Sequence, residues 1–243
     1  MQRLAEFLWR RLAAWMAARG LRDAPAAMHA GGADERSAAM YSRPGRKFLH
    51  VGCGRMRKPD IGPALQADDW LEIRLDIDPA VQPDIFASML DMSAVPTASV
   101  DAVYSSHNIE HLYAHEVPVA LAEFLRVLKP DGFALVTCPD LQSICRLVVE
   151  DELDRPAYVA PAGPIAPLDV LYGHRPQLAA GNLYMAHRTG FTLKTLVAAM
   201  RAAGFRSVAG QRREDAYALW VIAAKAPIPE EELRHLAAAH FPP

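Results

Sequence analysis

The chain has 243 residues, of which 51% are hydrophobic, so it contains enough apolar side chains for one sizeable core. The formal net charge of -2 gives no electrostatic reason to expect nucleic acid as a partner, and a small-molecule partner is the simpler prediction. The three cysteines are odd in number and lack metal-type spacing, which argues against a disulfide framework and predicts a cytoplasmic location.

The first 45 residues differ in pattern from the rest of the chain. Residues 2–19 carry leucines and Trp15 at helical spacing with arginines around them, which predicts an amphipathic helix, and residues 20–45 have the composition of a linker. Docking on the following domain is the simpler role for this helix, and contact with a membrane surface is the alternative. No apolar run approaches the roughly 18 residues of a membrane span, so no integral span is predicted.

Residues 46–226 alternate short apolar segments with helical patterns. Apolar runs at 48–51, 71–77, 85–87, 100–105 and 133–138 predict parallel core strands, and 205–208 and 217–224 predict two closing strands that pair antiparallel. Such alternation requires crossover helices. The prediction is therefore an α/β, Rossmann-like doubly wound fold, with a mainly parallel seven-stranded sheet, helices on both faces and an antiparallel last strand.

Two further segments complete the predicted organisation. The Pro-rich region at about 151–191 has no sustained period, so it is expected to be an irregular, lid-like insertion that covers a binding site. Residues 227–243 are expected to form a C-terminal tail with one short helix.

The residues with chemical interest follow the predicted strands, where ligands bind in parallel sheets. The turn Gly52-Cys53-Gly54 lets backbone approach a ligand closely, and Asp76, 22 residues after Gly54, suits hydrogen bonding to ribose hydroxyls. Asp91 and Met92 could meet an adenine, although an ordinary Asx turn explains this pair equally well. A dense polar cluster follows the fourth strand.

The order of these motifs resembles the class I S-adenosylmethionine-dependent methyltransferases, particularly the methyltransferase type 11 group. The resemblance covers roughly residues 47–140. It rests on the glycine turn and on the blocks Leu75-Asp76-Ile77-Asp78, Asp101-Ala102-Val103, Ile109-Glu110-His111-Leu112 and Arg126-Val127-Leu128-Lys129-Pro130-Asp131-Gly132.

The resemblance implies S-adenosyl-L-methionine as cofactor, with the glycine turn at its methionine part, Asp76 at the ribose and the loop after Cys138 near the acceptor. The cofactor-binding residues are then expected to be His50, Gly52, Cys53, Gly54, Asp76, Ile77, Asp91, Met92 and Ser106. Three features depart from the family pattern: His50 replaces an acidic residue, Met56 replaces a third glycine, and residues 78–85 are too few for the usual helix.

Methyl transfer from a sulfonium requires in-line alignment and removal of a proton from the acceptor. His107, His111 and His187 are the candidate catalytic bases, because histidine titrates near neutral pH. Glu110 either orients His111 or has a structural role at a helix start. A metal site on His107, His111 and His115 is a disfavoured alternative, so no metal is predicted.

The predicted function is methyl transfer to a small-molecule or carbohydrate-like acceptor at oxygen or nitrogen. An NAD(P)-dependent oxidoreductase is the main rival, but Met56 stands near the position of the third glycine of its fingerprint. A catalytically silent cofactor-binding interaction protein is the other alternative. Acceptor pockets in this fold come from variable loops, here 151–191, so the sequence does not identify the acceptor.

Overall fold

The computed structural model describes residues 40–242, and residues 44–243 form one compact unit. The helix predicted at residues 2–19 and most of the predicted linker lie outside the described residues. Within the described part of the chain, no helix has both the length and the apolar character needed to cross a membrane.

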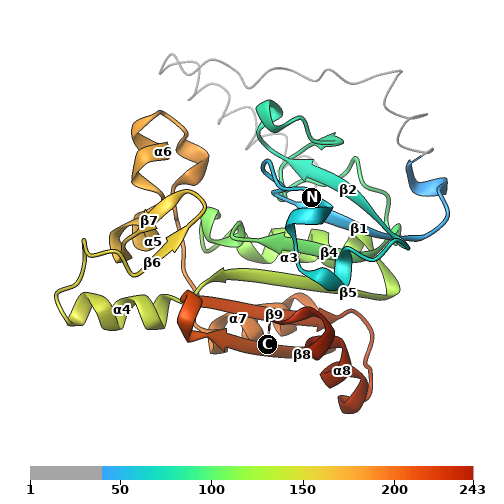
Figure 1. Cartoon of the computed structure of the whole chain (residues 1–243). Coiled ribbons are helices and arrows are strands. Elements are labelled where there is room, and N and C mark those ends of the chain that lie inside the picture. Colours follow the sequence, from blue (N-terminus) through green and yellow to red (C-terminus); the bar gives the residue numbers. More distant parts are fainter. Residues whose placement is uncertain (1–39, 243) are drawn as a thin grey trace, which may run out of the picture. The chain divides into compact units, whose positions relative to one another are not determined.

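Seven strands form one sheet in the order β3-β2-β1-β4-β5-β9-β8 (Figure 1). The strands are β1 (Arg46–Val51), β2 (Trp70–Asp76), β3 (Ile85–Phe86), β4 (Val100–Ser106), β5 (Leu128–Pro139), β8 (Ser207–Arg213) and β9 (Ala218–Ala224). Neighbours among β1 to β5 pair in parallel, whereas β9 is antiparallel to both β5 and β8. The predicted mainly parallel, Rossmann-like sheet is confirmed.

Helices cover both faces of this sheet, as predicted. They are α3 (Val117–Val127), α4 (Leu141–Val149), α5 (Pro167–Tyr172), α6 (Arg175–Ala179), α7 (Leu193–Ala203) and α8 (Glu230–His240). Successive residues of a strand point to opposite faces. Gly210 and Val221 lie on the face covered by α7, whereas their neighbours Ala209 and Ile222 belong to the apolar cluster against which α8 packs.

The C-terminal helix α8 covers the sheet where the usual crossover helices are missing. Only 3-10 turns connect β1 to β2 and β2 to β3. Leu233, Leu236 and Phe241 of the α8 region pack against the cluster that contains Trp70 and Phe133. The short helix expected in the C-terminal tail is thus α8, and it packs on the sheet.

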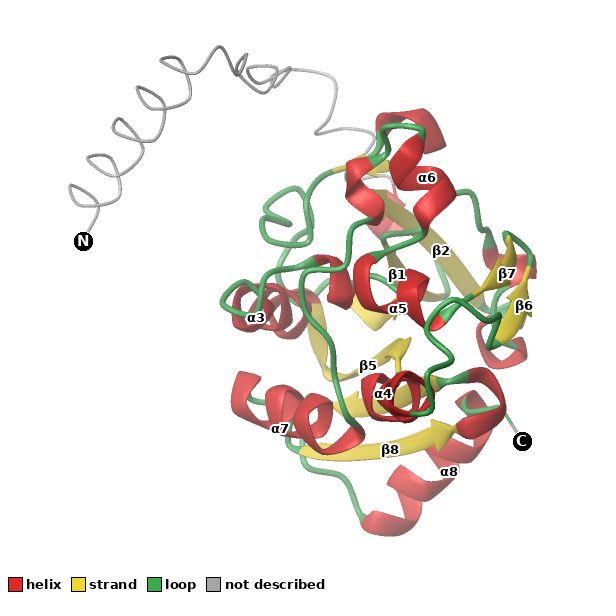
Figure 2. Cartoon of the chain, turned by 90° about the vertical axis from the view of Figure 1, so that its left-hand side faces the viewer, coloured by secondary structure: helices red, strands yellow, loops and turns green. Residues whose placement is uncertain are grey.

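The insertion at 151–191 is more regular than predicted. It contains the hairpin β6 (Tyr158–Ala160) and β7 (Gly163–Ile165), followed by α5, α6 and the 3-10 turn Leu183–Met185 (Figure 2). The prolines fit because Pro164 lies in a two-stranded ribbon whose strands are both edges, and Pro167 occupies the first turn of α5. Proline density therefore concealed short elements here.

Within this insertion, Asp169 accepts hydrogen bonds from Arg175 Nε at 2.8 Å and Ala166 N at 2.9 Å. Burial acts to raise the pKa of Asp169, but these bonds outweigh it and lower the pKa from 3.8 to about 2. A lowered folded-state pKa stabilises the fold above the unfolded-state pKa, and this stabilisation is lost as pH falls from about 4 toward 2.

We expect Asp169→Asn to reduce the free energy of unfolding by about 2 kcal/mol at pH 7 and to weaken its pH dependence between about pH 4 and 2. Urea unfolding at several pH values measures both effects. Asp154→Asn is the control, because Asp154 also contacts Arg175 but is largely exposed, and little change is expected there. Equal effects of the two substitutions would contradict the conclusion that the hydrogen bonds of buried Asp169 provide this stabilisation.

Candidate functional site

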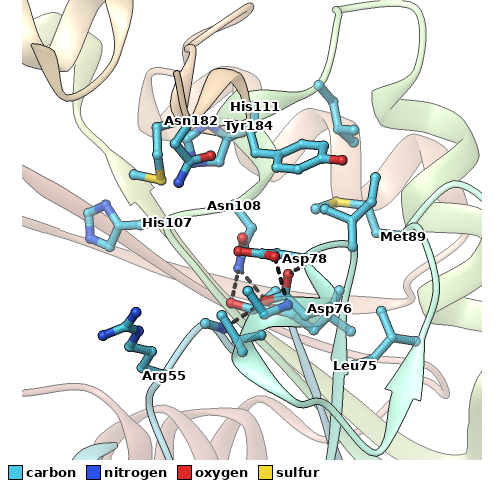
Figure 3. Close-up of a pocket in the computed structure, with 18 of the residues that line it drawn as sticks. Arg55, Leu75, Asp76, Asp78, Met89, His107, Asn108, His111, Asn182 and Tyr184 are labelled. Carbon is cyan, nitrogen blue, oxygen red and sulfur yellow. Dashed lines mark hydrogen bonds between the residues drawn. The ribbon is translucent and has the colours of Figure 1, made fainter. Parts of the chain in front are cut away.

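A cavity of about 540 Å³ opens beyond the carboxyl ends of β1, β2 and β4 (Figure 3). The strand order reverses between β1 and β4, which is where ligands bind in open parallel sheets. The cavity volume lies in the usual range for a small-molecule site. The insertion contributes Gln177, Asn182, Tyr184, Met185 and Arg188 to its wall.

Asp76 joins the glycine turn to the end of β2. Gly52 and Gly54 both have left-handed backbone, with φ of +63° and +52°, and both line the cavity. Gly54 N donates to Asp76 Oδ2 at 2.7 Å, and Asp78 N donates to Oδ1 at 2.8 Å. A carboxylate has about four acceptor positions, so Asp76 keeps capacity for ligand hydroxyls. The structure thus brings the predicted turn and the predicted ribose carboxylate together.

Two residues that the sequence analysis did not single out hold the walls of this cavity. Asn108 Nδ2 donates to Val51 O at 2.8 Å and to Gly52 O at 3.1 Å. Arg74, 3% exposed, donates to Gly54 O at 2.6 Å and to Gln82 O at 2.8 Å. In the sequence, Arg74 could have been noticed as an arginine within an apolar strand, and Asn108 as an asparagine within the polar cluster after β4.

His50 and Cys53 do not line the cavity. His50 is 2% exposed and its Nδ1 lies 2.7 Å from Glu72 Oε1, so β1 directs this ring into the packed interior. Cys53 is 1% exposed, and burial raises the pKa of its thiol to about 12, which removes it as a nucleophile near neutral pH. Of the expected cofactor-binding residues, four do line the cavity: Gly52, Gly54, Asp76 and Ile77.

The residues after β3 lie differently from the expectation. Met92 is fully buried and its N–H donates to Glu123 Oε2, while Asp91 borders a different surface hollow. The cavity is lined instead by Met89. The reason is the tight turn after β3, in which Asp91 N donates to Ser88 O. Ser106 also lies outside the cavity lining, and its Oγ pairs with Thr137 Oγ1 at 2.7 Å.

The three candidate bases are distributed over two neighbouring cavities. His107 and His111 line the large cavity, whereas His187 and Glu110 line a second cavity of about 330 Å³. Arg188 lines both cavities. The structure therefore places the predicted histidines at the boundary between two spaces, an arrangement suited to a cofactor on one side and an acceptor on the other.

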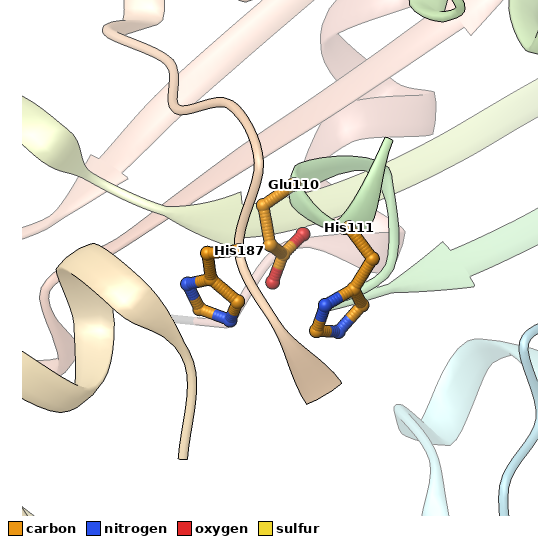
Figure 4. A group of neighbouring side chains, drawn as sticks. All are labelled: Glu110, His111 and His187. Carbon is orange, nitrogen blue, oxygen red and sulfur yellow. The ribbon is translucent and has the colours of Figure 1, made fainter. Parts of the chain in front are cut away.

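Glu110 lies beside the rings of His111 and His187, whose centroids are 4.9 Å apart (Figure 4). It is 2% exposed, and burial acts to raise its pKa, but contact with His107 and the charges of the three histidines outweigh burial and lower it. Burial lowers the pKa of His187 more than the charge of Glu110 raises it.

Part of the chain matches a known protein family. Residues 68–136 match the family model described as a methyltransferase domain. This matched segment lies within the part of the chain whose motifs resemble S-adenosylmethionine-dependent methyltransferases, so the match supports that resemblance. A search of the curated proteins found no match.

Solved structures of methyltransferases are similar to this chain in fold. The CurJ carbon methyltransferase superposes with a TM-score of 0.50 at 12% identity, covering 78% of this chain and 51% of that chain. A SAM-dependent methyltransferase, possible histamine N-methyltransferase, from Thermotoga maritima has a TM-score of 0.49 at 14% identity, with 79% and 88% covered. A SAM dependent methyltransferase from Archaeoglobus fulgidus has 0.49 at 15% identity, with 80% and 95% covered.

Proposed function

We propose that the methyltransferase domain binds S-adenosyl-L-methionine in the 540 Å³ cavity and transfers the methyl group to a small hydroxylated or sugar-like acceptor at oxygen or nitrogen. The observation that carries this proposal is the link between the glycine turn and Asp76 at the point where the strand order reverses. That link brings exposed backbone and an acceptor carboxylate to one end of a cavity large enough for the cofactor.

The contacts suggest an orientation for the cofactor. Asp76 would accept hydrogen bonds from the ribose hydroxyls, and the backbone of Gly52 and Gly54 would approach the methionine part. Ile77 and Met89 supply apolar surface for the adenine. The sulfonium would then lie toward the end of β4, near His107.

The acceptor would occupy the 330 Å³ cavity beside Glu110 and His187. Its oxygen or nitrogen forms the bond to the methyl carbon as the carbon–sulfur bond breaks, and the electron pair of that bond stays on sulfur. The acceptor's proton must leave, and imidazole groups at the boundary of the two cavities are suited to accept it. A small cavity whose mainly apolar wall also includes Glu110, His187 and Arg188 favours a metabolite over a macromolecule.

Calorimetric titration of the purified full chain tests this function. We expect saturable binding of one S-adenosylmethionine per chain and at least about tenfold weaker binding of NADH, because the turn lacks the third glycine of the dinucleotide fingerprint. S-adenosylhomocysteine should compete for the same site. A preference for NADH, or no binding of the methyl donor, would overturn the proposal. Donor binding without turnover across an acceptor screen would indicate a silent cofactor-binding protein.

A further inference from the structure

The Glu110 carboxylate is buried without a hydrogen-bond partner. It belongs to the 3-10 turn Ile109–His111 after β4, is 2% exposed, and neither oxygen has a partner within hydrogen-bonding distance among the described residues. Its contact with His107 Nδ1 is 3.6 Å, beyond a hydrogen bond. Removing a charged carboxylate from water in this way is costly unless a cation compensates it.

Two imidazoles flank this carboxylate. One ligand atom each of Glu110, His111 and His187 lies within 4.8 Å of the others (Figure 4). His187 Nδ1 lies 2.6 Å from Val170 O, and His111 Nδ1 lies 3.1 Å from Ala186 O. A carbonyl oxygen only accepts, so each Nδ1 donates a hydrogen to it, and Nε2 is the ring nitrogen that remains to bind an ion. Metal-binding histidines are commonly oriented by such bonds.

The backbone holds the three side chains together although they come from distant parts of the chain. Glu110 O accepts hydrogen bonds from Arg188 N at 2.9 Å and from Thr189 N at 3.2 Å. These bonds fix the segment that carries His187 against the turn that carries Glu110 and His111. Ligand atoms each about 2.1 Å from an ion are at most about 4.2 Å apart, so small side-chain rotations complete the site.

We propose that Glu110, His111 and His187 bind a divalent transition-metal ion, for which Zn²⁺ is the appropriate probe. Two imidazoles and one carboxylate match the donor preference of Zn²⁺, whereas Mg²⁺ and Ca²⁺ prefer oxygen ligands. Three protein ligands leave a coordination position open, and the 330 Å³ cavity lined by Glu110 and His187 provides room for a further ligand.

An ion at this position also indicates the class of methyl acceptor. This part of the inference rests on the proposed methyltransferase function. A hydroxyl oxygen that coordinates the ion loses its proton to water more readily. That oxygen then bonds to the methyl carbon, and the electron pair of the broken carbon–sulfur bond stays on sulfur. The site therefore favours hydroxylated acceptors and O-methylation. In this arrangement His111 and His187 are ligands, and His107 remains the candidate base.

Metal binding is tested directly, without cofactor or acceptor. Untagged full-length protein is treated with chelator, dialysed and titrated calorimetrically with ZnCl₂ and, separately, with MgCl₂. We expect one Zn²⁺ per chain and at least about 100-fold weaker binding of Mg²⁺. Glu110→Gln keeps the side-chain volume and His187→Ala removes one ligand, and each should weaken Zn²⁺ binding by about tenfold or more. His115→Ala, at an exposed histidine outside the group, is the control and should bind like the wild type.

Binding of less than one Zn²⁺ per chain by the wild type, or wild-type affinity in Glu110→Gln, would overturn the site. If His187→Ala fails to fold, Co²⁺ added to the wild type gives a second measurement. Visible absorption bands that Zn²⁺ abolishes are expected from the assigned donors, and their absence would also overturn it. Titration of the same samples with S-adenosylmethionine separates the two proposals, since either ligand can bind while the other does not.

Discussion

Replacing Asp76 with alanine should reduce the affinity for S-adenosylmethionine by about 100-fold or more. A hydrogen bond to a charged acceptor contributes about 1.5–3 kcal/mol, and the variant would lose the bonds to the ribose hydroxyls. It would also release Gly54 N and Asp78 N, which Asp76 holds at 2.7 Å and 2.8 Å. Calorimetric titration measures the affinity, and circular dichroism verifies that the variant is folded.

Three further variants separate ligand contact from loop damage. Asp76→Asn keeps the side-chain shape but removes the charge, so it should bind more weakly than the wild type yet retain more affinity than Asp76→Ala. Asp78→Ala tests the alternative that Asp78 holds the ribose, because Asp78 lines the same cavity. Asp131→Ala, at an exposed position outside the cavity, is the control. Wild-type affinity in Asp76→Ala together with loss in Asp78→Ala would move the ribose contact to Asp78.

Substitution of Gly52 by alanine should reduce the free energy of unfolding by about 3 kcal/mol or more. The residue has φ of +63°, and an added Cβ would overlap the Asn108 side chain. That side chain has little freedom to move, because its Nδ2 donates to Val51 O and Gly52 O. Backbone strain and steric overlap therefore add together. Urea unfolding of the purified variant measures the change.

Gly54→Ala is the matched control for this substitution. Gly54 has a similar φ of +52°, but among the described residues no atom beyond its two chain neighbours lies within 4 Å of the position that a Cβ would take. Only backbone strain applies there, so a loss of about 1–2 kcal/mol is expected. The double variant Gly52→Ala/Asn108→Ala removes the overlap. Its loss of unfolding free energy should therefore be smaller than the sum of the losses in the two single variants. Equal losses in the two single variants would show that Asn108 does not constrain the turn.

Local patterns were sufficient to predict the sheet. Apolar runs such as Phe48–Val51 and Phe133–Cys138 are typical of parallel core strands that are buried on both faces, and the helical patterns between such runs indicate crossover connections. The glycine turn and Asp76 were predictable for the same reason, because each directly follows a strand and all parallel strands end at one edge. The exception was the insertion, where prolines at edge and first-turn positions did not prevent short elements.

The sequence by itself determined the fold class, the glycine turn, the place of Asp76 at the end of β2 and the polar cluster after β4, since each depends on residues close together in the chain. Only the tertiary structure decided which of the candidate side chains reach the cavity. His50 is buried beside Glu72, and Met89 lines the cavity where Met92 was expected. Only the tertiary structure, too, brings His187 to Glu110 and His111. That approach depends on backbone hydrogen bonds from Arg188 and Thr189 across 78 residues or more, a pairing that no local pattern records.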